Sequence, residues 1–345
     1  MVTISLCMIV KNEEKVLARC LDSIYDLMDE IIIVDTGSTD KTKEIAARYT
    51  DKIYDFEWIK DFSAARNFAF SKAGCDYIYS ADADEVLNAE NREKFKALKE
   101  VLMPEVEIVQ MYYGNQLSHG TVYNFDRELR PKLFKRLRTF QWIEPVHETV
   151  RLLPVVFDSD IEITHLPENP HTGRDLAIFR GIIERGEVLS ERLFDFYARE
   201  LFVSGSPEDF ARAEDYFTEI ADDENTSAEQ MKAAVCVVVR AAALRKDYLK
   251  MYRYAMKDIA SEGVSEVCYE LGEYYFGQKE YKEAVLWFYN AAYQTACILN
   301  IHYRGEKPLY RLADCYEALG MLQEAAAYRA EGEQWLIQHA QAETD

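Results

Sequence analysis

Three carboxylates stand together where an apolar run ends. The segment Ser80-Ala81-Asp82-Ala83-Asp84-Glu85 follows Tyr77-Ile78-Tyr79, which has the composition of a buried strand. Because alternate residues of a strand point the same way, we expect Asp82 and Asp84 on one face of the strand end. Such a pair suits Mg²⁺ or Mn²⁺, which bind one or two protein carboxylates and leave positions open for a diphosphate. The alternative is an acidic segment that caps the next helix, with Glu85 and the acidic residues after it in that role.

The elements that would position these carboxylates alternate between strands and helices. This order predicts an α/β domain with a doubly wound sheet, in which ligands bind at the carboxyl ends of the strands. The predicted strands cover residues 1–10, 30–35, 53–56 and 76–81, and the predicted helices cover 13–27, 39–49 and 63–73.

Polar clusters fall at the carboxyl ends of these predicted strands. Asn12 and Glu13 follow the first strand, and Asp35 ends the second. Arg66 and Asn67 lie early in the helix after the third strand. Each cluster alone is an ordinary turn or helix cap. Since all of them converge on one edge of the sheet, the sequence predicts a ligand site there.

Four segments in this order resemble the family 2 glycosyltransferases of the GT-A fold. They are SLCMIVKNEE at 5–14, VDTGSTD at 34–40, DFSAARN at 61–67 and DADE at 82–85. The resemblance covers about the first 90 residues. It implies a cytoplasmic enzyme that uses a nucleotide-activated sugar, with a uridine diphosphate sugar favoured, and that inverts the anomeric carbon.

The resemblance also implies roles in donor binding. Asp35 would accept a hydrogen bond from a pyrimidine imide or a ribose hydroxyl, and Asn12 and Glu13 would complete that pocket. Arg66 would bind a phosphate oxygen through its planar guanidinium. The alternatives are that Asp35 only forms the turn before Thr36-Gly37, and that Arg66 pairs with a surface aspartate, Asp61 or Asp40.

The resemblance places a metal ion at the acidic motif. Asp84 would be the direct ligand of Mn²⁺ or Mg²⁺, Asp82 would face the ribose or the metal, and Glu85 would contact the donor sugar. The metal would stabilise negative charge on the departing diphosphate.

A later segment resembles the ending of a subset of these enzymes, in which a tryptophan precedes Val-His-Glu. Here Trp142 precedes Val146-His147-Glu148. His147 would be a further metal ligand, and either Glu148 or Glu144 would remove the acceptor proton. The sequence does not separate the two glutamates. It also leaves Trp142 as either a wall of the acceptor site or a core residue, and His147 as either a ligand or a hydrogen-bonded core histidine. The aromatic stretch 111–126 lies where acceptor contacts vary in the family.

The second half has helical periodicity from about residue 172, after the Pro-containing stretch 166–173. We therefore expect a glycosyltransferase domain at 1–170 and a tetratricopeptide-like helical domain at 174–345, with about four helical hairpins. The spacing that indicates this repeat is Leu271-Gly272, Tyr275, Ala284, Phe288 and Ala291, and it recurs downstream. Such a domain either recruits a protein acceptor, forms a homodimer or serves as a scaffold.

The composition limits the partners. A net charge of −21 and a pI near 4.8 argue against nucleic acid or anionic lipid as a partner, since both require basic patches. The apolar first strand lacks a basic flank and is not a signal peptide, and no segment has the length of a membrane span. A cytoplasmic location is expected.

The sequence therefore predicts a metal-dependent, inverting glycosyltransferase with a protein, peptide or cell-surface glycan acceptor. Two other functions stay open. One is a noncatalytic peptide-binding adaptor built on a degenerate transferase domain. The other is a nucleotidyltransferase that uses the same Asp-x-Asp geometry.

Overall fold

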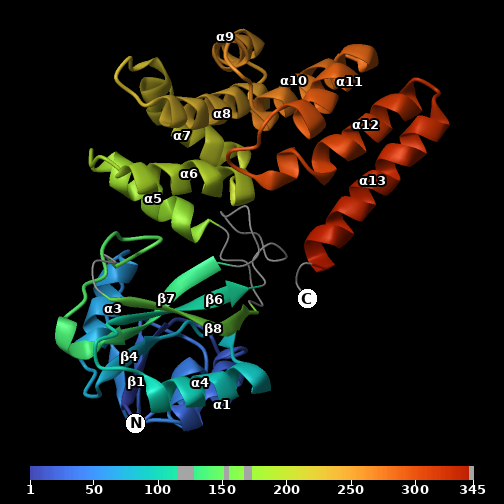
Figure 1. Cartoon of the computed structure of the whole chain (residues 1–345). Coiled ribbons are helices and arrows are strands. Elements are labelled where there is room, and N and C mark those ends of the chain that lie inside the picture. The colour runs from blue at the N-terminus through green and yellow to red at the C-terminus, as the bar shows by residue number, and fades with distance from the viewer. Residues whose placement is uncertain (115–127, 151–154, 167–172, 342–345) are drawn as a thin grey trace. The chain divides into compact units, whose positions relative to one another are not determined.

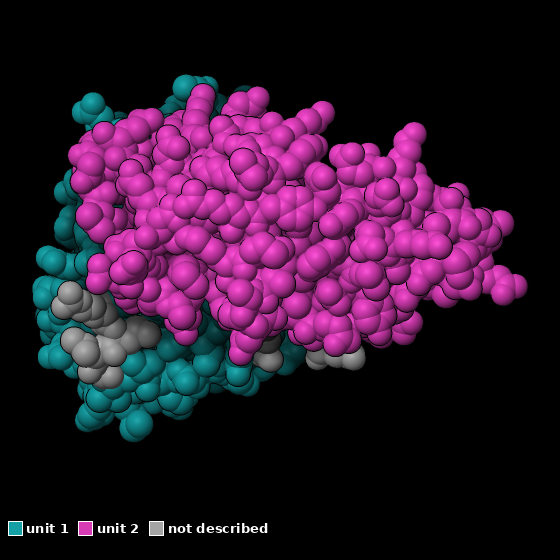
Figure 2. All heavy atoms as spheres, turned by 90° about the horizontal axis from the view of Figure 1, so that it is seen from above, with its two compact units in different colours: residues 1–119, 125–170 teal, residues 120–124, 171–345 magenta. Residues whose placement is uncertain are grey.

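The computed structural model describes residues 1–114, 128–150, 155–166 and 173–341. These residues form two compact units, one that ends at residue 166 and one that begins at residue 173 (Figure 2). The predicted end of the first domain, residue 170, lies outside the described residues.

The first unit contains an eight-stranded mixed sheet in the order β3-β2-β1-β4-β7-β6-β8-β5. Figure 1 labels five of these strands, β1, β4, β6, β7 and β8. The strands β1 to β4 run parallel, as predicted, and β7 runs antiparallel to both β4 and β6. The predicted α/β fold class is confirmed. The strands are β1 Ile4–Val10, β2 Glu30–Asp35, β3 Ile53–Asp55, β4 Tyr77–Ser80, β5 Glu85–Val86, β6 Ile108–Gly114, β7 Glu128–Lys135 and β8 Val156–His165.

The first three helices of this unit lie close to their predicted positions but are shorter, and a fourth helix follows β5. They are α1 Leu17–Ile24, α2 Thr42–Ala46, α3 Phe62–Phe70 and α4 Ala89–Val101. The helix predicted at 39–49 contracts to α2, because Asp40 accepts hydrogen bonds from the Thr42 backbone N–H at 3.0 Å and hydroxyl at 2.5 Å and so closes a turn before the helix. Asp61 caps α3 by accepting from the Ala64 N–H at 3.0 Å.

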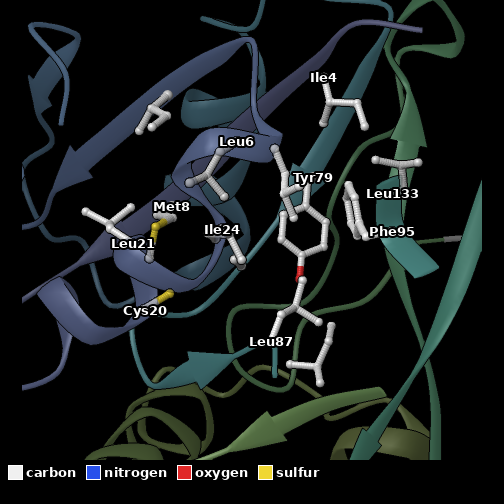
Figure 3. Close-up of a cluster of buried hydrophobic side chains, with 14 of the residues drawn as sticks. Ile4, Leu6, Met8, Cys20, Leu21, Ile24, Tyr79, Leu87, Phe95 and Leu133 are labelled. Atoms are coloured by element: carbon white, nitrogen blue, oxygen red, sulfur yellow. The ribbon is translucent and has the colours of Figure 1, made fainter. Parts of the chain in front are cut away.

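Each face of the sheet carries its own core, which follows from the alternation of buried side chains along β1. On one face, Leu6 and Met8 pack with residues of α1 and α4, and Tyr79 stacks edge-on against Phe95 at 5.3 Å (Figure 3). On the other face, Cys7 packs with Phe70 of α3 and with Trp142. Helices therefore cover both faces of the strands that carry the site.

The parallel register brings the ends of four strands, β1 to β4, toward one edge. Val10 of β1 lies beside Asp35 of β2, Asp35 lies beside Asp55 of β3, and Cys7 of β1 lies beside Ser80 of β4. The loops that follow β1, β2 and β4 are consequently neighbours.

The second unit is helical throughout its regular elements. Its helices are α5 Arg174–Glu184, α6 Glu191–Ser204, α7 Pro207–Asp222, α8 Ala228–Leu244, α9 Tyr248–Ile259, α10 Ser265–Gly277, α11 Tyr281–Tyr289, α12 Glu306–Ala318 and α13 Leu322–Gln341. Consecutive helices pack on each other, most closely α7 with α8, α10 with α11 and α12 with α13. The Gly272 residue of α10 lies against the Phe288 ring of α11, where an added Cβ would be 2.6 Å from the ring. The helical array confirms the predicted tetratricopeptide-like spacing.

Within the described ranges, no helix combines the length and the apolar run that a membrane span requires.

Candidate active site

Asp35 ends β2 at the edge where the parallel strands meet, and its side chain is buried. Its Oδ2 atom accepts hydrogen bonds from the backbone N–H groups of Gly37 at 3.1 Å and Ser38 at 2.9 Å, so the predicted turn is present. Its Oδ1 atom is also buried and has no hydrogen-bond partner among the residues that the structure describes. A buried carboxylate oxygen is costly without a donor, so a ligand that donates a hydrogen bond would fit at this position.

The loops after β1 and β2 bind each other beside Asp35. The Asn12 backbone N–H donates to the Ser38 hydroxyl at 2.9 Å, and the Asn12 side-chain oxygen accepts from the Thr39 N–H at 2.8 Å. Asn12 adopts a left-handed φ of 57°, which asparagine tolerates better than most residues. The Glu13 N–H donates to Thr42 at 2.7 Å. Asn12 and Glu13 therefore help to shape the loops around Asp35.

Arg66 connects the acidic motif to the segment around residue 148. From α3 it donates through Nη2 to Asp82 at 2.8 Å, through Nη1 to Ser80 at 3.1 Å and through Nε to Glu148 at 2.5 Å. Its guanidinium carbon also lies 4.9 Å from the centre of the Trp142 ring. The surface pairings considered from the sequence are wrong, because Arg66 is largely buried and turns toward these groups instead.

Arg66 and Asp82 hold each other in the ionised form. Burial lowers the pKa of Arg66, but the carboxylates of Asp82 and Glu148 outweigh that effect, so the pKa lies above its ordinary value. Burial raises the pKa of Asp82, but the charges of Arg66 and Lys132 outweigh it and hold the pKa well below its usual range. Asp82 is therefore an anion at neutral pH.

Asp82 and Asp84 contact different elements. The strand alternation used in the sequence argument ends at Ser80, and a turn follows in which the Glu85 N–H donates to the Asp82 carbonyl at 3.3 Å. Asp82 binds Arg66 of α3, whereas Asp84 Oδ2 lies 3.1 Å from Nε2 of His165 at the end of β8. The expectation based on alternation does not apply, because the backbone turns after the strand ends.

His165 was not identified from the sequence, since β8 was not predicted. The period-two pattern of a strand is present in this segment, because the buried residues Ser159, Ile161 and Ile163 alternate with more exposed residues. Among the described residues, no group of three or more His, Cys, Asp and Glu side chains is arranged to hold a metal ion. The set Asp82, Asp84 and His147 is consequently not assembled in this structure, and a ligand role for His147 stays a prediction.

Glu85 forms a buried ion pair with Lys132 of β7, a residue that the sequence argument did not single out. Both side chains are less than one-tenth exposed. Burial raises the pKa of Glu85 to about 7, with Lys132 opposing the shift and Asp82 adding to it. Glu85 also lies beside His165 in the pairing of β5 with β8. A contact between Glu85 and a donor sugar stays a prediction.

The segment 142–149 carries the candidate bases. Trp142 is buried and packs against Phe70 and Phe134 with ring centres 5.8 and 5.6 Å apart, so it is a core residue that also contacts Arg66. Glu144 has a left-handed φ of 71° and is partly buried, while Glu148 is held by Arg66. Of the aromatic stretch 111–126, residues 111–114 lie in β6, and the rest lies outside the described residues.

Comparison of the sequence with known protein families identifies the family of the domain that contains this site. Residues 5–152 match the family model described as Glycosyl transferase family 2, so this segment is a family 2 glycosyltransferase domain, as the sequence motifs predicted.

Several curated proteins are similar to this chain. The TPR repeat-containing protein Synpcc7942_0270 of Synechococcus elongatus is 49% identical over 25% of this chain and 22% of its own length. The SPbeta prophage-derived glycosyltransferase SunS of Bacillus subtilis is 29% identical over 60% of this chain and 51% of its own. The chain thus spans about a fifth and about half of the lengths of these two relatives.

Solved structures are similar at a greater distance. The glucosyl-3-phosphoglycerate synthase from Mycobacterium tuberculosis, in complex with Mn²⁺ and uridine diphosphate glucose, shares 15% identity at a TM-score of 0.41. The alignment covers 55% of this chain and 81% of that one. Residues 1–349 of TarS from S. aureus share 16% identity at a TM-score of 0.36, over 73% of this chain and 88% of that one.

Proposed function

We propose that this chain is a metal-dependent, inverting glycosyltransferase that moves a sugar from a uridine diphosphate donor to a protein, peptide or cell-surface glycan. The observation that carries the proposal is the convergence of three groups at one edge of the sheet in a family 2 domain. These groups are the Asp35 carboxylate with its unpartnered oxygen, the Arg66 and Asp82 pair, and the Asp84 and His165 pair.

The chemistry of Asp35 favours a uracil base. An ionised carboxylate can only accept hydrogen bonds. The imide N–H of uracil donates one, whereas the corresponding ring nitrogen of cytosine is an acceptor. The buried Oδ1 of Asp35 therefore fits a uridine nucleotide better than a cytidine nucleotide. The loop that carries Asn12 and Glu13 would form part of the wall of this pocket.

Asp84 and His165 would hold the metal ion. Their side-chain atoms lie 3.1 Å apart, and an oxygen and an imidazole nitrogen are a suitable pair of ligands for Mn²⁺. A site with two protein ligands agrees with ions that take their remaining ligands from substrate phosphates and water. A bound divalent ion would neutralise charge on the departing diphosphate. His147 is retained as the alternative histidine.

Arg66 would serve the donor in two ways. It fixes the Asp82 carboxylate, and it has donors left for a phosphate. The guanidinium has five N–H groups, and three of them donate to Asp82, Ser80 and Glu148. The others would be available to a phosphate oxygen at the same edge of the sheet.

An inverting transfer requires a base on the side of the anomeric carbon opposite the diphosphate. Glu148 and Glu144 are the candidates, and both lie on the segment that Arg66 holds through Glu148. The helical array would recruit the acceptor, form a homodimer or act as a scaffold.

The test is release of nucleoside diphosphate from a panel of nucleotide sugars with Mn²⁺ or Mg²⁺. We expect release from a uridine diphosphate sugar that falls at least a hundredfold in Asp84→Ala. The matched control is Asp160→Ala, since Asp160 is an exposed aspartate on β8. Equal release by the Asp84 variant and the wild type would refute the catalytic assignment. Absence of both release and uridine diphosphate binding would favour the adaptor, and consumption of a sugar 1-phosphate would favour the nucleotidyltransferase.

A further inference from the structure

Asn67 makes a paired contact with the backbone of the segment that carries the candidate bases. Its Nδ2 donates to the Trp142 carbonyl at 2.9 Å, and its Oδ1 accepts from the Trp142 N–H at 2.8 Å. A side-chain amide can donate to and accept from one backbone residue at the same time, as a neighbouring strand would. Asn67 is partly buried on α3, and it directly follows Arg66.

The contact fixes one end of a closed loop. Ile143 and Thr149 exchange two backbone hydrogen bonds, of 2.9 and 3.1 Å, and so close the loop that contains Glu144 and Glu148. Asn67 binds the residue directly before this closure. A second attachment lies within the loop, where the Phe62 N–H of α3 donates to the Pro145 carbonyl at 2.9 Å.

Adjacent residues of α3 thereby hold the two halves of the site. Arg66 binds Asp82 on the donor side and Glu148 on the loop, while Asn67 sets the backbone position at which the loop begins. These attachments, together with the packing of Trp142 against Phe70 and Phe134, tie the segment that carries the two glutamates to the rest of the domain. A shift of the loop would therefore move the base relative to the donor.

We infer that Asn67 is a positioning residue for the transfer reaction, acting through the 142–149 loop on the glutamate that serves as base. This inference rests on the proposed function. A displacement of about 1 Å at a reacting group can cost about a hundredfold in rate. Loss of the Asn67 contact should therefore reduce turnover while it leaves nucleotide binding intact, because the hydrogen bonds of Asp35 come from Gly37 and Ser38, whereas Asn67 binds Trp142.

The test compares Asn67→Asp and Asn67→Ala with the wild type in the full chain. Asn67→Asp keeps the shape of the side chain but cannot donate to the Trp142 carbonyl. The matched control is Ser71→Ala, which removes a hydrogen bond that stays within the end of α3. Three quantities are measured: the Kd for uridine diphosphate with Mn²⁺, the kcat for release of uridine diphosphate from the donor, and the hydrogen exchange of amides 142–149.

We expect both Asn67 variants to lower kcat at least tenfold, to keep the Kd within about twofold and to exchange faster at residues 142–149, with no such change in Ser71→Ala. Asn67→Ala is also combined with Glu148→Gln and, separately, with Glu144→Gln. In the double variant whose glutamate is the base, the Asn67 substitution should lower kcat little further. A wild-type kcat in the Asn67 variants, or an equal loss of kcat and nucleotide binding, would overturn the inference and leave the proposed function standing. A wild-type protein that neither binds uridine diphosphate nor consumes any donor would overturn the proposed function instead.

Discussion

The replacement Arg66→Met tests the charge cluster at the centre of the site. Methionine keeps an unbranched apolar side chain against Trp142 but removes the guanidinium from Asp82 and Glu148. The side chains of Arg66 and Glu148 are 12% exposed and that of Asp82 is 36% exposed. Removing one partner of a buried ion pair costs about 3–5 kcal/mol. Because Asp82 is partly screened by water, we expect the low end, about 3 kcal/mol.

This loss should appear as a lower melting temperature for the N-terminal unit. For a unit of this size, 1 kcal/mol corresponds to about 2–4 °C, so Arg66→Met should lower the transition by about 6–12 °C near pH 7.5. Differential scanning calorimetry of the full chain measures this shift. The matched control is Lys43→Met, which removes the exposed pair with Asp55 in the same unit and should cost less than about 1 kcal/mol.

The pH dependence separates the electrostatic explanation from a loss of packing. The pKa of Asp82 is depressed in the folded protein, so its stabilisation is present above the unfolded value of 3.8 and is lost only as the pH falls through the folded pKa. In the variant, by contrast, Asp82 has lost the largest charge that opposes the effect of its burial, so it takes up a proton at a higher pKa than in the wild type, which relieves part of the cost. The difference between wild type and variant should therefore narrow from about pH 7.5 to about pH 4.5 without closing. A difference that stays constant with pH, or that is no larger than the control, would refute the reasoning.

Three further predictions concern the base pocket, the metal ligands and the helical array. Asp35→Ala should weaken uridine diphosphate binding about tenfold or more by calorimetry, since a hydrogen bond to a charged group contributes about 1.5–3 kcal/mol; unchanged binding would exclude the Asp35 pocket as the base site. Chelation of divalent ions should abolish donor turnover. His165→Ala should raise the Mn²⁺ concentration for half-maximal turnover at least tenfold. If only His147→Ala has this effect, the metal ligand is His147 instead. Gly272→Ala should destabilise the helical unit by about 1–3 kcal/mol through overpacking. The control is Gly277→Ala on the same helix, where the added Cβ meets open space and the change should be neutral or stabilising. Equal melting temperatures for the two variants would contradict the packing argument.

Much of the first half of the fold could be predicted from local sequence patterns. The strands β1 to β4 are short apolar runs separated by helical periods, and parallel strands in such an arrangement place their carboxyl ends at one edge. Asp35, Arg66, Asp82 and Asp84 could therefore be predicted to lie near this edge without knowledge of their partners. The helical array could be predicted in the same way, because its buried residues recur at the helical period.

The partners themselves depend on contacts between distant parts of the chain. Glu85 and Lys132 are 47 residues apart, and Asp84 and His165 are 81 residues apart. These pairs form because β7 inserts between β4 and β6, and because β8 lies between β6 and β5. A period of two residues identifies a strand but carries no information about its neighbours.

The sequence by itself thus determined the family of the segment 5–152, and it predicted the edge of the sheet at which the candidate site residues lie. The tertiary structure decided which polar side chains pair with one another: Arg66 with Asp82 and Glu148, Lys132 with Glu85, and His165 with Asp84. The physical reason is that backbone patterns are set by neighbours along the chain, whereas the pairing of buried charges is set by strand order and by the cost of leaving a charge without a partner.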